Sequence, residues 1–214
     1  MDIREQFKGL FYNQSGLYQD GIVQEHIDKA KEIGLFKLFL PKELGGMDYD
    51  LEQTLKVFRD TAYCNGSFGW LIQIGNGGNY FVTNCTDLTN QHFFAQPDAL
   101  LTGSAMVGGV AVVVAGGFLV SGQWKYASGS NFATVFTATV QVEATGEIVT
   151  ALVPGNKVAV IEDWDALGMR YTFSNSFSLK NVFVPADHFF STSKRINYLE
   201  HSLFELPFFI YAQV

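Results

Sequence analysis

The segment with the clearest chemical potential covers residues 122–129, where a run ending in Tyr126, Ala127, Ser128 and Gly129 follows an apolar stretch. The pattern predicts a strand that ends in a turn of small residues. Tyr126 and Ser128 are two positions apart, so in an extended strand their side chains would share one face. Such a pair could hold a flat heteroaromatic ring by packing along its edge and by one hydrogen bond.

The bulk composition narrows the classes of function. The chain has 214 residues, of which 48% are hydrophobic and 16% charged, which is typical of a globular protein with one large domain or two small ones. The net charge of -7 and the lack of a concentrated basic stripe argue against nucleic-acid binding. No run approaches the roughly 18 apolar residues of a membrane span, and the N-terminus has no secretory pattern. We therefore expect a cytoplasmic protein with neither a nucleic-acid nor a membrane partner.

The cysteines and histidines give no sign of a metal site. Cys64 and Cys85 stand far apart and form no ligand pattern with the four histidines. We expect both thiols to be inert in a reducing compartment. No arrangement typical of a Ser-His-Asp triad or of a carboxylate pair is visible. The catalytic residues stay unknown at this point.

The first half of the chain has helical periodicity. Val23, Ile27 and Ala30 predict a helix that ends near Gly34. Asp50 followed by Gln53 has the spacing of a capping box, and predicts a second helix. Further helices are expected over residues 68–82 and, after a Thr86 cap, through residue 94.

After residue 97 the pattern changes to short β-branched runs separated by turn residues. Strands are predicted over residues 100–102, 110–115, 118–126, 134–142, 148–153, 158–162 and 177–184. The predicted class is α+β, with a helical domain over residues 1–97 and an antiparallel β-barrel domain over residues 98–192. Residues 193–214 are predicted to start a helical segment that is cut short. Their large apolar side chains need a partner surface, so we expect a homo-oligomer.

Four segments, found in the same order along the chain, resemble the acyl-CoA dehydrogenase superfamily. They are residues 34–46, residues 66–70, residues 116–129, and residues 164–174 followed by 182–185. The resemblance implies a helical domain, a β-domain and a C-terminal four-helix bundle, of which this chain has only the start. It also implies a flavin cofactor, FAD, and an acyl-CoA or other small organic substrate. In the dehydrogenases of this family the catalytic base commonly lies in the bundle.

One departure from the family pattern favours a particular branch. The dehydrogenases usually have Trp-Ile-Thr-Asn at the flavin strand, whereas this chain has Tyr126, Ala127, Ser128 and Gly129. This sequence motif resembles that of the two-component flavin monooxygenases, in which reduced FMN or FAD is supplied by a separate reductase. The expected partner is then a flavin reductase. For a dehydrogenase it would be an electron-transfer partner.

The resemblance also assigns roles to single residues. Ser128 would form a hydrogen bond with flavin N5, and Tyr126 would pack along the ring edge. Thr102 and Ser104 correspond to the segment that meets the flavin pyrimidine, although the Glu-Pro of the family pattern is missing there. Trp70 and Asn76 would lie on the helix that lines the substrate side of the site. Each also has a plain structural interpretation: a strand-end serine that caps its own turn, or an aromatic or polar residue of the core.

Three functions therefore remain open. The first is a flavin-dependent oxidoreductase of the acyl-CoA dehydrogenase type, which could be inactive in so short a chain. The second is the oxygenase component of a two-component flavin monooxygenase. The third is a non-catalytic shortened homologue that acts as a binding or scaffold protein.

Overall fold

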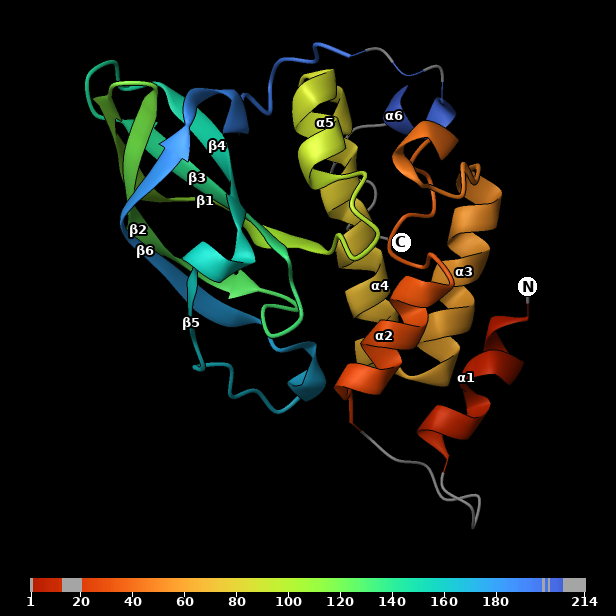
Figure 1. The fold of residues 1–214 in the computed structure, drawn as a ribbon. Coiled ribbons are helices and arrows are strands. Elements are labelled where there is room, and N and C mark those ends of the chain that lie inside the picture. The colour runs from red at the N-terminus through yellow and green to blue at the C-terminus, as the bar shows by residue number, and fades with distance from the viewer. Residues whose placement is uncertain (1, 13–20, 198, 200, 206–214) are drawn as a thin grey trace.

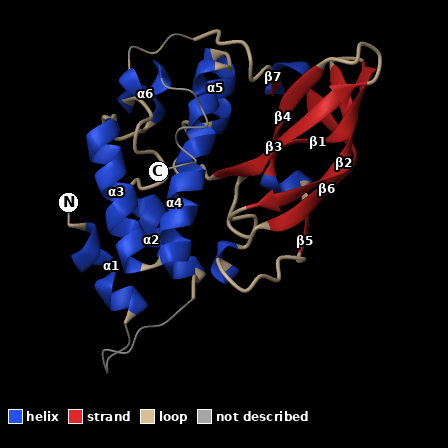
Figure 2. Cartoon of the chain, turned by 180° about the vertical axis from the view of Figure 1, so that it is seen from behind, coloured by secondary structure: helices blue, strands red, loops and turns tan. Residues whose placement is uncertain are grey.

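A helical region and a single sheet lie side by side in the computed structural model, which describes residues 2–12, 21–197, 199 and 201–205. The helices form one half of the molecule and the strands the other (Figures 1 and 2). Helices α4 and α5 are the ones that face the sheet, while α1 lies on the far side of the helical half. The α+β class, with helices before strands, is confirmed.

The helices begin where the sequence provides caps. Asp50 Oδ1 accepts a hydrogen bond from Gln53 N at 2.8 Å, and Gln53 Oε1 accepts one from Asp50 N at 3.0 Å, as the capping box predicts. Thr86 caps α5 by accepting from Thr89 N. The α-helices are α1 (Ile3–Phe11), α2 (Gln24–Glu32), α3 (Leu51–Cys64), α4 (Gly66–Gly78), α5 (Asp87–Phe93) and α6 (Ser202–Glu205).

Two features of the helical half differ from the prediction. Helix α1 was not predicted. The helix expected over residues 68–82 is divided, because α4 ends at Gly78 and the chain continues as the 3₁₀ helix η2 (Asn79–Thr83). Three glycines near the end of α4 lower its helix propensity, which favours this change to tighter turns.

The sheet contains seven strands in the order β5-β6-β2-β1-β3-β4-β7. They are β1 (Leu101–Val114), β2 (Gly117–Ala127), β3 (Val135–Val142), β4 (Ile148–Pro154), β5 (Ala159–Ile161), β6 (Asn175–Pro185) and β7 (Phe189–Phe190). Among these strands β1 and β3 pair in parallel, and the other neighbours are antiparallel. The prediction of a closed, antiparallel barrel is therefore wrong. The sheet is open, with β5 and β7 at its two edges, and the pair of β1 with β3 is parallel.

Apolar side chains pack in three places: within the helices, between the helices and the sheet, and on the sheet itself. The middle cluster includes Leu203 and Phe204, at 0% and 2% exposure, which pack with Phe39 and Tyr80. These two side chains of the C-terminal segment are thus buried within the chain, whereas Ile196, near its start, is 42% exposed. The remaining residues of the expected aromatic tail, 206–214, lie outside the described residues.

Both cysteines are free thiols in the interior. Burial raises the pKa of Cys85 to about 12 and also raises that of Cys64. Neither thiol will carry much thiolate at neutral pH, in agreement with the inert role expected of them. Among the described residues, no group of three or more His, Cys, Asp or Glu could hold a metal ion. None of the helices described is long and apolar enough to cross a membrane.

An ion pair joins α1 to α3. Arg4 donates through Nε and Nη2 to Asp60 Oδ1 at 3.1 and 2.8 Å, and Arg59 Nη2 donates to the same oxygen at 3.2 Å. Burial alone would raise the pKa of Asp60, but the hydrogen bonds from both arginines outweigh it, and the pKa lies below its ordinary value. The ionised carboxylate thus stabilises the fold at neutral pH, and this contribution is lost as the pH falls through the lowered pKa.

Asp60→Asn is expected to lower the free energy of unfolding by about 1 kcal/mol at pH 7, because both arginines are partly exposed and water screens the pair. The difference from wild type should narrow from about pH 4 downward, because the carboxyl of the unfolded chain is protonated there before the native carboxyl, whose pKa is lower. Urea unfolding of the wild type and of Asp60→Asn at pH 7, 5, 4 and 3 measures this difference in the free energy of unfolding. Asp28→Asn, on the surface of α2, is the control. A difference that stays constant over this range would contradict the prediction.

Candidate functional site

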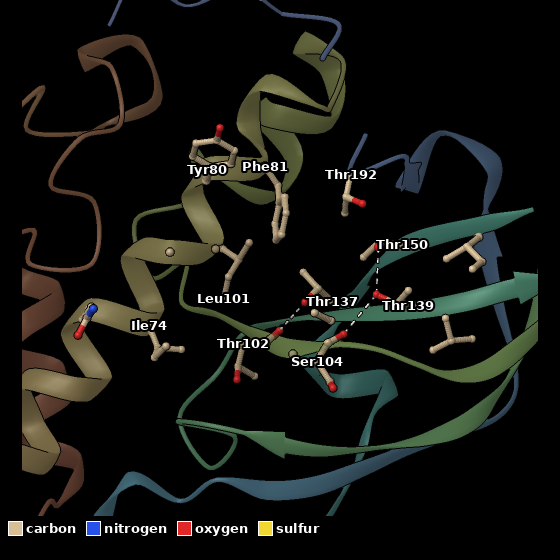
Figure 3. A pocket seen from close by; sticks show the side chains of 17 residues that line it. Ile74, Tyr80, Phe81, Leu101, Thr102, Ser104, Thr137, Thr139, Thr150 and Thr192 are labelled. Carbon is tan, nitrogen blue, oxygen red and sulfur yellow. Dashed lines mark hydrogen bonds between the residues drawn. The ribbon is translucent and has the colours of Figure 1, made fainter. Parts of the chain in front are cut away.

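A cavity of about 540 Å³ lies where the helices meet the sheet (Figure 3). Helix α4 and the 3₁₀ helix η2 line one side of it, and strands β1, β3 and β4 line the other. The volume is in the range of sites that hold a small molecule or a cofactor. Thr102 and Ser104, two of the residues that the sequence analysis selected, belong to its wall.

Strand β1 is irregular beside this cavity. Its parallel pairing with β3 is interrupted between Ser104 and Gly109, and its pairing with β2 begins only at Gly109. The backbone of residues 105–108 consequently lies outside both paired registers, as in a bulge. Met106 and Val107 are 68% and 47% exposed in this stretch. Ala105 and Val107 of this stretch line the cavity, and Met106 N donates to Ser104 Oγ at 3.4 Å.

Three threonines form a second polar wall. Thr137 Oγ1 donates to Thr102 O at 3.3 Å, Thr139 Oγ1 donates to Ser104 O at 3.2 Å, and the hydroxyls of Thr139 and Thr150 are 3.1 Å apart. In Figure 3 the Thr102 and Ser104 side chains point away from these threonines, to the other side of β1. A Cβ at position 103 would lie 1.9 Å from Thr137 Oγ1, so only glycine fits there.

The sequence analysis did not select these threonines. Thr137 and Thr139 alternate along one predicted strand, and this spacing places both side chains on one face. This alternation can be seen in the sequence, but it does not determine which face of the strand lines a cavity. Only the parallel pairing of β1 with β3 brings the hydroxyls to the carbonyls of Thr102 and Ser104.

Trp70, Ser128 and Thr102 come together at the end of β2. Trp70 Nε1 donates to Ser128 Oγ at 3.0 Å, and Thr102 Oγ1 donates to the backbone oxygen of Ser128 at 2.6 Å. Trp70 and Ser128 are half-buried, and Thr102 is 4% exposed. These three of the six predicted site residues, taken from α4, β1 and the end of β2, thus form one polar cluster next to the cavity. Their roles stay predictions.

Tyr126 does not follow the simple alternation of a strand. Its φ of 66° is in the left-handed region, and the pairing of β2 with β6 shifts between Trp124 and Ala127. The chain is therefore not extended at this point, and the argument that put Tyr126 and Ser128 on one face does not hold. The Tyr126 ring is 65% exposed and meets Trp164 edge to face, with ring centroids 6.4 Å apart.

Asn76 is a structural residue, which corrects the prediction that it contacts substrate. Its side chain is 0% exposed. Oδ1 accepts from Leu38 N at 2.9 Å, and Nδ2 donates to Leu35 O and Ile72 O at 2.7 and 2.8 Å. Both donor hydrogens of the amide are used inside the protein, so it can give none to a ligand. The side chain instead fixes the backbone between α2 and α3 to α4.

The polar groups of this junction have the donors and acceptors that a flavin ring needs. The pyrimidine edge of a flavin has two carbonyl oxygens, which require donors. The Ser104 hydroxyl is a donor of that kind, and its oxygen accepts from Met106 N at 3.4 Å. Ser128 Oγ, an acceptor toward Trp70, can interact with the central ring nitrogen. The residues present therefore fit a flavin in kind.

Comparison with known proteins supports the same family over most of the chain. Residues 14–96 match the acyl-CoA dehydrogenase N-terminal domain. A pigment production hydroxylase of Rhodococcus sp. (strain ATCC 21145) is 32% identical over 167 residues, which are 76% of this chain and 43% of the relative. The flavin-dependent monooxygenase oxygenase subunit HsaA of Mycobacterium tuberculosis (strain ATCC 25618 / H37Rv) is 29% identical over 171 residues, 78% of this chain and 43% of that subunit.

Solved structures agree on the fold. The HsaA monooxygenase from M. tuberculosis superposes with a TM-score of 0.73 at 27% identity, over 80% of this chain and 48% of that one. XiaF from Streptomyces sp., in complex with FADH2 and glycerol, gives a TM-score of 0.79 at 23% identity, over 88% of this chain and 50% of that one. The chain spans about half the length of the curated relatives it matches. It belongs to the acyl-CoA dehydrogenase superfamily, of which it contains the helical N-terminal region and the sheet that follows.

Proposed function

We propose that this chain provides the helical and sheet regions of the oxygenase component of a two-component flavin monooxygenase. The observation that carries the proposal is the set of curated relatives. Several of them, matched over three quarters of this chain or more, are named as flavin-dependent monooxygenases or hydroxylases. The motif of Tyr126, Ala127, Ser128 and Gly129 supports the same branch of the superfamily, the two-component flavin monooxygenases. An acyl-CoA dehydrogenase-like oxidoreductase is the broader alternative within the superfamily.

In this proposal a reduced flavin, FMN or FAD, would supply the electrons that allow one atom of dioxygen to be inserted into a small organic substrate. Ser128 would interact with the central ring nitrogen, and Ser104 with the backbone of Ala105 and Val107 would bind the pyrimidine edge. Trp70 would hold Ser128 in place and close the helical side of the site. Tyr126 would cover the ring edge from its exposed position at the end of β2.

The proposal includes a partner and a location. Flavin reduced elsewhere must reach the site, so a flavin reductase is the expected partner. A cytoplasmic homo-oligomer is proposed with it, on the sequence of residues 206–214 alone, because the large apolar residues before them, Leu203 and Phe204, are already covered within the chain.

Anaerobic titration of the chain with FAD and FMN, each oxidised and reduced, tests the function. We expect at least one reduced flavin to bind at least tenfold more tightly than its oxidised form. Tight binding of oxidised FAD with no gain on reduction would favour a dehydrogenase and contradict the oxygenase. A chain that binds no flavin in either state would instead favour the non-catalytic homologue.

A further inference from the structure

Ser128 is the first member of a chain of three hydroxyls. Ser128 Oγ and Ser174 Oγ are 2.8 Å apart, and Ser174 Oγ and Thr172 Oγ1 are 2.7 Å apart. Thr172 Oγ1 is also 2.9 Å from the backbone oxygen of Met169. Ser128 directly follows β2, Ser174 directly precedes β6, and Thr172 is the last residue of the 3₁₀ helix η4 (Arg170–Thr172). Each hydroxyl has one hydrogen to donate, so the direction of the whole chain is set at one end.

The Met169 end sets that direction. A backbone carbonyl can only accept, so the proton between Thr172 Oγ1 and Met169 O must belong to Thr172. Met169 O also accepts from Trp164 Nε1 at 3.0 Å and from Thr172 N at 3.1 Å, and its contact with Thr172 Oγ1 is the shortest of the three. If the Thr172 proton pointed to Ser174 instead, two oxygens with no proton between them would lie 2.9 Å apart. Thr172 therefore accepts from Ser174, and Ser174 in turn accepts from Ser128.

This order leaves Ser128 with no hydrogen to give. Its proton points to Ser174, and one of its two lone pairs accepts from Trp70 Nε1, which can only donate. One lone pair remains on the half-buried oxygen. Toward a ligand, Ser128 is then an acceptor and not a donor.

The two oxidation states of a flavin differ at this point. Reduced flavin has an N–H at its central nitrogen N5, while oxidised flavin has a lone pair there. We propose that Ser174 and Thr172 are positioning residues: by holding the Ser128 proton away from the ligand they make the site select flavin reduced at N5. This rests on the proposed function, and on Ser128 as the residue that meets N5.

The surroundings hold the hydroxyl chain in this order. Thr172 and Ser174 are 0% and 6% exposed, so water has little access to reverse it. Gly129 N donates to Thr172 O at 2.7 Å, and Ser130 Oγ donates to Phe173 O at 2.8 Å. These bonds fix the backbone that follows β2 to the backbone that precedes β6, and with it the distances between the hydroxyls.

Ser174→Ala tests the inference. Removal of the Ser174 hydroxyl frees the Ser128 proton, which can then be donated to oxidised N5. We expect the ratio of the oxidised to the reduced dissociation constant to fall at least tenfold, which corresponds to a bound-flavin midpoint potential about 30 mV lower. Anaerobic titration and spectroelectrochemistry measure the two quantities. Thr172→Val should shift the ratio in the same direction and serves if Ser174→Ala does not fold.

Two further variants separate proton direction from a lost contact. Ser174→Thr keeps the hydroxyl and should keep the wild-type ratio. Trp70→Phe removes a donor to Ser128 but leaves its proton committed to Ser174, so affinity for both states should change while the ratio stays.

The outcomes distinguish this inference from the function on which it rests. A wild type that prefers reduced flavin, with ratios unchanged in both Ser174→Ala and Thr172→Val, would overturn the inference and leave the oxygenase proposal standing. A fall in the ratio for Trp70→Phe as large as that for Ser174→Ala would also overturn it. If the wild type binds no flavin, both fail.

Discussion

Trp124→Ala is expected to lower the free energy of unfolding by about 3–5 kcal/mol, the usual cost of removing a large aromatic side chain from a packed interior. The indole is 2% exposed and stacks on Phe177, with ring centroids 5.0 Å apart and planes at 14°. Its Nε1 donates to Thr139 O at 2.8 Å. The substitution therefore opens a cavity in the centre of the sheet and also leaves a buried carbonyl with one partner fewer.

The cavity cannot collapse easily, because the indole lies in a slot lined by glycines. A Cβ on Gly108, Gly109 or Gly122 would come within 2.9 Å of the Trp124 ring. Backbone cannot move in to replace the ring without disturbing the pairing of β1 with β2. Trp124→Phe should cost less, since it keeps most of the ring area and loses the hydrogen bond.

Urea unfolding followed by circular dichroism measures the cost. Lys125→Ala, at the next and exposed position of β2, is the control and should change the free energy of unfolding by less than about 0.5 kcal/mol. If Trp124→Ala were no more costly than the control, the packing of β2 against the sheet core would be incorrect.

Local signals in the sequence were sufficient for most helices. The capping box at Asp50 and the cap at Thr86 use side chains that act on amides three residues away, so their effect can be read without the rest of the fold. Helix α1 was missed although it has a cap of the same kind, since Asp2 Oδ1 accepts from Glu5 N at 3.2 Å. The helix is also stabilised by tertiary contacts, because Phe7 and Phe11 pack on Phe68 with ring centroids 4.8 and 5.4 Å away.

Long-range features of the sheet could not be predicted from the sequence. The parallel pair of β1 with β3 joins segments more than thirty residues apart, and nothing in the alternation of either strand specifies its partner. The same limit applies to the candidate site. The resemblance selected Ser128, Trp70 and Thr102, which do meet, but Asn76 was chosen by position on a helix whose buried face could not be known.

Gly69→Ala is expected to lower the free energy of unfolding by about 2–3 kcal/mol, which is at the upper end of the cost of overpacking a core. A Cβ at this position would lie 2.4 Å from Ala62 Cα and 2.6 Å from Ala62 N. Both atoms are backbone atoms of α3, so no side chain can turn away to make room. Helices α3 and α4 must separate, and Trp70, at the next position of α4, must shift relative to Ser128.

Gly77→Ala is the matched control in the same helix. No atom lies within 4 Å of the added Cβ, so the substitution adds only helix propensity and should stabilise by about 0.5 kcal/mol. The two changes thus have the same chemistry and opposite expected signs. Urea unfolding gives both values, and tryptophan fluorescence of the Gly69→Ala variant reports whether Trp70 has moved. Destabilisation of similar size in both variants would mean that alanine destabilises helix α4 for a reason other than contact with α3. The close approach of the two helices would then no longer explain why a glycine precedes Trp70.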